Sequence, residues 1–241
     1  MPTQDQPTND TAEEYAPLPI WEGQSIALRF FATFISVLFH PIFVFAYMYV
    51  LLAWVNPHAF GKPHWHDVFE GDALGLYLRI LLSMILLPLL AIALMRGLNM
   101  ISSIQLHQRE DRIAPYIAVG LCYIIAFVQV NNVHTLPIHI KIYALGSTIA
   151  LFGAFVMNLV TKVSAHTVGM GGMLAMTLMS VLSVSVAQER SLHIVPIVIV
   201  IAGLVGTSRR LLGAHEMNDL YGGYFIGFFS QFVAMRFLYN G

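Results

Sequence analysis

The sequence predicts an all-α membrane protein, a polytopic bundle of six to seven transmembrane helices. Of its 241 residues, 57% are apolar and only 10% are charged, and the mean hydropathy is +0.71. A soluble domain of this length would carry roughly a quarter of its residues as charged side chains. The apolar residues also gather in long segments with polar clusters between them, which is typical of membrane-spanning helices.

The chain divides into a polar start and one membrane domain. Residues 1–22 are rich in Pro and Thr and contain five acidic residues but no Lys or Arg. We expect a disordered tail there, without the basic start and short apolar core of a cleavable signal peptide. Residues 23–241 are expected to form a single transmembrane domain, and a net charge of −1 gives no basic surface for nucleic acid.

Seven apolar segments follow the tail. A helix needs about 20 apolar residues to cross a bilayer, and all but the sixth segment reach or approach that length. The sixth could be completed by Ser208–Arg210, and the first is overlong and contains Pro41, which predicts a kink or break. The segments are 26–55, 73–96, 113–131, 140–161, 166–187, 192–207 and 214–238.

Three polar loops lie on one side of such a seven-pass chain: Arg96–Arg112, Lys162–His166 and Ser208–Ala214. An even number of passes separates any two of them, so their side chains can converge. This side holds six Lys and Arg residues against four on the other side, which alone would place it in the cytoplasm. Arg109, Arg112 and Arg209 are candidates for binding substrate. Without them the count of Lys and Arg becomes three on this side against four on the other, which slightly favours a site that faces outward.

The third loop carries the densest group of ionisable residues. If a helix resumes near His215, Asp219 lies four residues on and shares its face. A carboxylate there would hold the imidazole in one tautomer and leave the other ring nitrogen as nucleophile or base. Arg209 could grip an oxyanion with its forked donors. The alternative is an interfacial loop whose Arg side chains only set topology.

The other two loops also contain anion-binding residue types. Ser164 precedes an apolar helix, where it could cap exposed backbone donors, and His166 could give a proton to a leaving oxygen. Arg109 and Arg112 lie three apart and could neutralise a phosphate. The alternatives are an ordinary Ser cap with an interfacial His, and a mixed-charge loop in which Glu110 and its neighbour pair with the two Arg residues.

The remaining motifs favour structural roles. We interpret His40, beside Pro41, as a hydrogen-bonding core residue, and His64–His66 as a solvated loop rather than a metal site. Methionines recur every three residues after His166, which predicts core packing, and Gly223 and Gly227 have the small-residue spacing that lets helices approach closely. The stripe comprises Met170, Met173, Met176 and Met179.

The three loops together resemble the type 2 phosphatidic acid phosphatase superfamily, which shares its helical core with vanadium haloperoxidases, and in particular its short bacterial membrane members. The third signature of that family is Ser-Arg, five residues, His, three residues and Asp, and this chain meets it in full. The matching positions are Ser208, Arg209, His215 and Asp219, with Gly213 and Gly223 where the family often has glycine.

The first two signatures are met in part. The second, Pro-Ser-Gly-His, corresponds to Val163–His166, which keeps the Ser and the His. The first, Lys, six residues and Arg-Pro, matches Arg112, but its Lys position holds Gln105 and its Pro is displaced to Pro115. Arg109 is a candidate to replace the missing positive charge.

The resemblance implies a metal-independent, cofactor-independent hydrolase of lipid phosphates or diphosphates. His215 would attack phosphorus, Asp219 would orient it, and His166 would protonate the leaving group. The phosphoryl oxygens would be held by Arg209, Ser164, Arg112 and Arg109. We expect the substrate to be phosphatidate, phosphatidylglycerol phosphate or undecaprenyl diphosphate, and the site to face the periplasm from the bacterial inner membrane. The alternatives are a lipid phosphotransferase with the same His-His-Asp site and a non-catalytic lipid-binding or transport relative.

Overall fold

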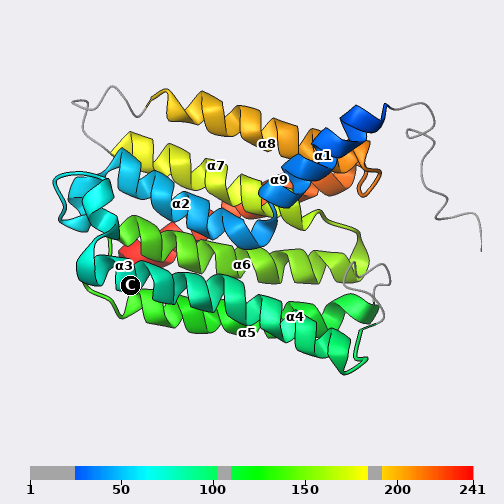
Figure 1. Ribbon diagram of the computed structural model, residues 1–241, viewed down its shortest axis with the longest axis horizontal. Coiled ribbons are helices and arrows are strands. Elements are labelled where there is room, and N and C mark those ends of the chain that lie inside the picture. The colour runs from blue at the N-terminus through cyan, green and yellow to red at the C-terminus, as the bar shows by residue number, and fades with distance from the viewer. Residues whose placement is uncertain (1–24, 102–109, 184–191, 241) are drawn as a thin grey trace, which may run out of the picture.

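The computed structural model describes residues 25–101, 110–183 and 192–240, and in these residues all regular secondary structure is helical (Figure 1). The predicted all-α class is therefore confirmed, whereas the predicted tail, 1–22, lies outside the described residues. The helices are α1 Ile26–Leu38, α2 Pro41–Val55, α3 Gly71–Leu81, α4 Leu87–Gly97, α5 Glu110–Asn131, α6 Ile138–Val160, α7 Ala165–Ser183, α8 Ile194–Leu211 and α9 Met217–Asn240.

The overlong first segment is broken, as the proline predicted. The helices α1 and α2 meet at a 65° bend with only Phe39 and His40 between them. Pro41 has no backbone N–H and is disfavoured inside a helix, but it fits the first position of a new one. The His40 side chain completes this start, because its Nδ1 accepts a hydrogen bond from the backbone N–H of Ile42 at 3.4 Å.

The second segment remains one rod despite Pro88. A π-helical turn, Leu82–Leu86, joins α3 to α4, and the whole rod spans 27 residues. The wider turn comes just before the proline, where the ring would otherwise crowd the carbonyl four residues earlier. Ser83 in this turn donates to Gln129 Oε1 of α5 at 2.9 Å, which ties the rod to its neighbour.

The described residues contain five helices long and apolar enough to cross a membrane, or six if the bent α1–α2 pair is one span. The count of six meets the lower end of the predicted six to seven spans and the count of five falls below it, while both agree with an integral membrane protein. Helix α9 is not among these candidates, although it is 24 residues long and packs along α6 and α7.

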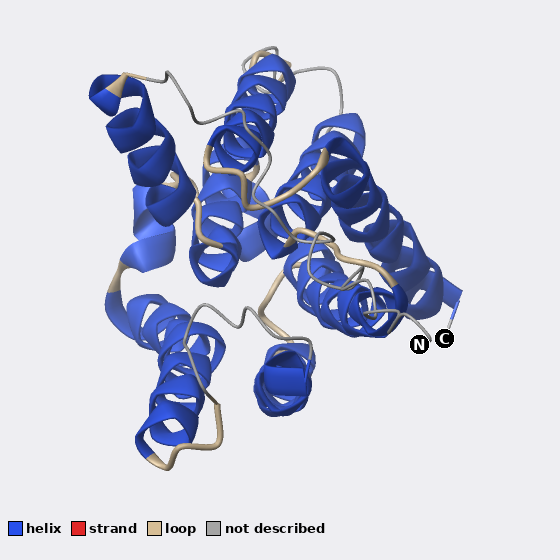
Figure 2. Ribbon diagram, turned by 90° about the vertical axis from the view of Figure 1, so that its right-hand side faces the viewer, coloured by secondary structure: helices blue, strands red, loops and turns tan. Residues whose placement is uncertain are grey.

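Helix α7 is the centre of the bundle. It contacts α2, α6, α8 and α9. In its most apolar 18-residue stretch 72% of the residues are buried, against 44% or less in the other candidate spans. Figure 2, an end-on view, shows the neighbouring helices grouped in a bundle. The methionine stripe lies on α7 and is confirmed as core packing, because Met170, Met173, Met176 and Met179 are all buried.

The glycine spacing is explained by the α7–α9 contact. A Cβ atom added to Gly223 would collide with Thr167 Oγ1, and one added to Gly227 would collide with the backbone of Val168. The two backbones can approach this closely only because both positions lack a side chain. The predicted close approach within the bundle is therefore confirmed, and it places the start of α9 directly beside the start of α7.

The described parts of the three polar loops lie at one end of the bundle, as their parity predicted. In Figure 1 the end of α4, the turn before α7 and the turn between α8 and α9 lie at the same end, together with the start of α1. The described C-terminal end of α9 lies at the opposite end. The candidate site residues are thus gathered by topology before any side-chain contact is considered.

Candidate functional site

The turn between α8 and α9 positions His215 against Asp219. Gly213 has a φ of +58°, a left-handed conformation that favours glycine, and it reverses the chain after α8. His215 Nδ1 lies 3.2 Å from Asp219 Oδ2, and the two side chains are only 12% and 14% exposed. The predicted contact is confirmed, and the helix resumes at Met217, two residues after His215.

The start of α9 explains why the contact survives without a helix at His215. The Asp219 carboxylate also accepts a hydrogen bond from the backbone N–H of Glu216 at 3.1 Å, which satisfies a donor at the helix start. An ionised carboxylate can only accept, so His215 Nδ1 must carry a proton and donate it. The Nε2 of a neutral His215 therefore carries the lone pair, which is the arrangement a nucleophilic imidazole needs.

Ser164 connects the second polar loop to this turn. Its backbone N–H donates to the carbonyl oxygen of Asp219 at 3.3 Å. Ser164 occupies the position before α7, as predicted, but the expected side-chain cap is wrong. Its hydroxyl is fully buried and has no hydrogen-bond partner in the described part of the chain, so it remains a donor at the positive end of α7.

His166 follows in the first turn of α7 and faces the break between α1 and α2. Its Nε2 lies 3.0 Å from the backbone oxygen of Ser36 and 3.3 Å from the Ser36 hydroxyl. Arg209, His40 and His215 all interact electrostatically with the His166 ring, so the residues of the second and third loops share one neighbourhood.

Arg209 lies in the last turn of α8 and points to the same place. Its Nη1 donates to the Ser36 hydroxyl at 2.6 Å, a short, charge-assisted hydrogen bond. Its Nε is buried and lacks a partner among the described residues. Two fixed donors without partners, Arg209 Nε and the Ser164 hydroxyl, thus accompany the two imidazoles.

The structure adds two residues, Ser36 and His40, that were not predicted as site residues. The ring of His40 lies edge-on to that of His166, with centroids 5.3 Å apart. His40 forms a hydrogen bond as predicted, but it is exposed rather than in the core. A His-Pro pair inside an apolar segment was the available signal for His40, whereas a single Ser in that segment gave none for Ser36.

The structure describes the two ends of the first polar loop, 96–101 and 110–112. Arg112 lies in the first turn of α5, at the same end of the bundle as the other loops. Arg109 and Gln105 lie outside the described residues. The predicted phosphate-binding roles of Arg109 and Arg112 therefore stay predictions.

The described parts of the chain contain no group of three or more His, Cys, Asp or Glu side chains that could hold a metal ion. What they bring together is an oriented imidazole, a second imidazole, a guanidinium and a buried hydroxyl at a helix start. Such a set can bind an oxyanion and exchange a proton with it. Ala165 and His40, at the edge of this set, are exposed, whereas the Ser164 hydroxyl and Arg209 Nε are buried.

The chain was compared with known proteins at three levels. No protein-family model, no curated protein and no solved structure matches it. The function has to be inferred from the side chains that meet at this end of the bundle.

Proposed function

We propose that the protein is an integral membrane phosphatase that cleaves a lipid phosphate or diphosphate through a phosphohistidine intermediate. The observation that carries the proposal is the His215–Asp219 pair, at 3.2 Å, which the Ser164 backbone joins to the start of α7, where Ser36 contacts both His166 and Arg209. This is the residue set expected from the likeness of the polar loops to the type 2 phosphatidic acid phosphatases.

In the first step, the lone pair of His215 Nε2 attacks phosphorus and forms a P–N bond. The bond between phosphorus and the lipid oxygen breaks, and that oxygen takes a proton from His166, which enters this step as an imidazolium and leaves it as a neutral imidazole. The Asp219 carboxylate stabilises the positive charge that develops on the His215 ring. The products of this step are the lipid alcohol, or the lipid monophosphate when a diphosphate is cleaved, and a phosphorylated His215.

In the second step, water attacks the phosphorus atom of the intermediate. His166, now unprotonated, takes a proton from this water as the P–N bond breaks. Inorganic phosphate leaves, and both imidazoles return to their starting protonation states. A lipid phosphotransferase would use the same two steps with an alcohol in place of water, so the two enzymes differ only in the acceptor.

The three equatorial oxygens of the transferring group carry the negative charge that must be stabilised. Arg209 Nε and the Ser164 hydroxyl are donors held in place before any substrate binds. The backbone N–H groups at the start of α7 add a partial positive charge. Preorganised donors of this kind are the main source of rate in phosphoryl transfer, and Arg112 and Arg109 are proposed to add to them.

The substrate is proposed to be a lipid because of where these residues lie. His166 and Arg209 sit at the ends of α7 and α8, two helices long and apolar enough to cross a membrane, and the surrounding helices expose large apolar side chains. The ends of spanning helices are where we expect lipid phosphates. Phosphatidate, phosphatidylglycerol phosphate and undecaprenyl diphosphate all present a phosphate at this level. The proposed location is the periplasmic face of a bacterial inner membrane.

The test is release of inorganic phosphate by the purified protein in detergent from these three lipids, with and without EDTA. We expect turnover of at least one lipid that EDTA leaves unchanged and that vanadate, a phosphorus mimic, inhibits. His215→Ala should abolish it. His193→Ala, which changes an exposed histidine at the start of α8, should not. Turnover that survives in His215→Ala would overturn the proposal, and binding without any turnover would indicate a lipid-binding protein.

A further inference from the structure

One residue of α1, Ser36, contacts both His166, the proposed acid for the leaving group, and Arg209, which is proposed to bind the phosphate. Its hydroxyl accepts from Arg209 Nη1 at 2.6 Å, and its backbone oxygen lies 3.0 Å from His166 Nε2. Ser36 is itself only 5% exposed. These contacts connect residues 130 and 173 positions apart in the chain.

The geometry fixes the direction of the hydrogen bond to His166. A backbone carbonyl can only accept, so the Nε2 of His166 must carry the proton and donate it to Ser36. The proton that the leaving oxygen needs is therefore directed at α1. Arg209 likewise directs one of its donors, Nη1, at α1. A bound phosphate could therefore accept from both Arg209 Nη1 and His166 Nε2 only if their hydrogen bonds to Ser36 were broken.

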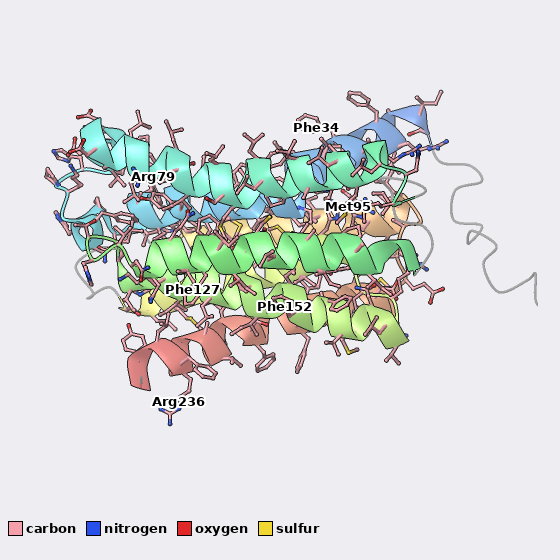
Figure 3. All side chains as sticks on the ribbon, turned by 90° about the horizontal axis from the view of Figure 1, so that it is seen from below. Phe34, Arg79, Met95, Phe127, Phe152 and Arg236 are labelled. Atoms are coloured by element: carbon pink, nitrogen blue, oxygen red, sulfur yellow. The ribbon has the colours of Figure 1, made fainter. Side chains whose placement is uncertain are left out.

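Most side chains of α1 are exposed, which for a helix in a membrane means that they face lipid. Only three of its 13 side chains are buried, Ala32, Ile35 and Ser36, and its main contact is with α8. Ile26 is 88% exposed and Phe30 is 74% exposed. Phe34, labelled in Figure 3, is 53% exposed. Few buried contacts are typical of segments that open at low cost.

The junction after α1 has the form of a hinge. Phe39 and His40 are the only residues between α1 and α2, neither is helical, and the helices meet at 65°. Pro41 prevents the two from merging into one straight helix. A few residues at the end of an element are sufficient to absorb a change of direction. The α1 helix can therefore move while α2 stays packed on α7, once the hydrogen bond from the Tyr47 hydroxyl of α2 to the Leu38 carbonyl of α1 is broken.

A phosphate is a better partner than Ser36 for both groups. The bond from Arg209 to the Ser36 hydroxyl is already charge-assisted, but an anionic acceptor adds the attraction of opposite charges to it. The hydroxyl and the carbonyl of Ser36 are neutral acceptors, whereas phosphoryl oxygens carry a negative charge. Arg209 therefore binds phosphoryl oxygens more strongly than it binds the Ser36 hydroxyl. When Ser36 leaves, the Nε2 proton of His166 is no longer hydrogen-bonded to the Ser36 carbonyl and can be given to the leaving oxygen.

We propose that α1 is a displaceable arm whose Ser36 stands in for the phosphoryl oxygens and must leave before substrate enters. The identity of the anion rests on the proposed function, while the movement of the arm can be measured without turnover. The arm keeps Arg209 and His166 paired when no lipid phosphate is present, and it opens the site from the side of α1.

The movement is tested by distance measurement between spin labels. In a Cys122→Ser background, one label at Ile26→Cys reports on the arm, and a second at Leu98→Cys or Phe225→Cys serves as reference. All three labelled positions are exposed. Orthovanadate should produce a second, displaced population in at least one pair. An unchanged distance distribution in both pairs would overturn the proposal, whether or not the protein releases phosphate.

Ser36→Ala provides the matched test of the contact. Loss of the bond to Arg209 should populate the displaced arm without vanadate and raise kcat/KM about three- to tenfold. Thr33→Ala, an exposed change on the same helix, should alter neither quantity. A fall in kcat/KM for Ser36→Ala would show that Ser36 supports the reaction directly, and the proposal would be wrong. If no lipid is hydrolysed, the distances alone decide.

Discussion

Asp219 makes three of the contacts that assemble the candidate site. Its carboxylate accepts from His215 Nδ1 and from the backbone N–H of Glu216, and its backbone oxygen accepts from the N–H of Ser164. The same residue therefore orients the proposed nucleophile, binds the backbone N–H just before α9 and links the turn to the start of α7. Substitution of its carboxylate alone would leave the backbone link in place.

We predict that Asp219→Asn lowers kcat by a factor of about 100 to 10,000, as happens when an orienting carboxylate loses its charge. An amide can present its NH₂ group to His215, which reverses the tautomer and removes the lone pair from Nε2. Phosphate release under saturating lipid measures the effect. Asp72→Asn, in the first turn of α3 at the far end of the bundle, is the control. A loss of less than threefold would contradict the orienting role.

Sequence reasoning at this scale could find pairs that lie close along the chain. The four-residue spacing of His215 and Asp219 predicted their contact, which is confirmed at 3.2 Å. It could not find Ser36, because the partners of this residue are brought to it by the bend at Pro41 and by the packing of α1 on α8. Nothing in the local sequence specifies either partner.

At the scale of elements, the α7–α9 contact determines how the second and third loops meet. Gly227 lies where a Cβ atom would collide with the Val168 carbonyl and approach the Gly172 backbone N–H at 2.8 Å. Both are main-chain groups in a buried helix, so they cannot turn aside as a side chain can. Any side chain at this position must separate the two helices.

Gly227→Ala should therefore destabilise the protein by about 1–3 kcal/mol, the usual cost of overpacking a core. Gly203→Ala on α8 is the matched control, since a Cβ atom there meets nothing within 4 Å. Alanine favours a helix by about 1 kcal/mol over glycine, so the control should be neutral or slightly stabilised. Thermal unfolding followed by circular dichroism in detergent compares the two. A Gly227→Ala protein as stable as the control would refute the close-packing account.

Helices were predictable as elements, but their ends were not. The apolar segment 192–207 predicted the core of α8, and the structure extends this helix to Leu211. The segment starting at 214 suggested a helix that includes His215, whereas α9 starts at Met217. The difference arises because the Asp219 carboxylate accepts the backbone N–H of Glu216 and so defines the start locally. Hydropathy contains no information on such a bond.

For the whole molecule, the even number of passes between the polar loops was more informative about their arrangement than the distribution of charged residues. The prediction that three separated loops share one end required only the number of passes, and the structure confirms it. Charge counts of six against four, or three against four, do not orient the bundle. The orientation proposed above follows from the expected function, in which the site faces the periplasm.

This orientation predicts the side on which the C-terminus lies, because the described end of α9 is opposite the site. A fluorescent protein that folds only in the cytoplasm should fluoresce when fused after Gly241 and expressed in a bacterial inner membrane. Alkaline phosphatase, which is active only in the periplasm, should be inactive at the same junction. The reverse pattern would place the site in the cytoplasm and contradict the proposed location.

The central claim, that His215 carries the phosphoryl group, is tested most directly by trapping the intermediate. Protein mixed briefly with lipid labelled with ³²P in the transferred phosphate, then denatured in base, should retain label that acid removes, as expected for phosphohistidine. His215→Ala should retain none, whereas His193→Ala should label like the unaltered protein. Label that resists acid, or label that persists in His215→Ala, would contradict the account.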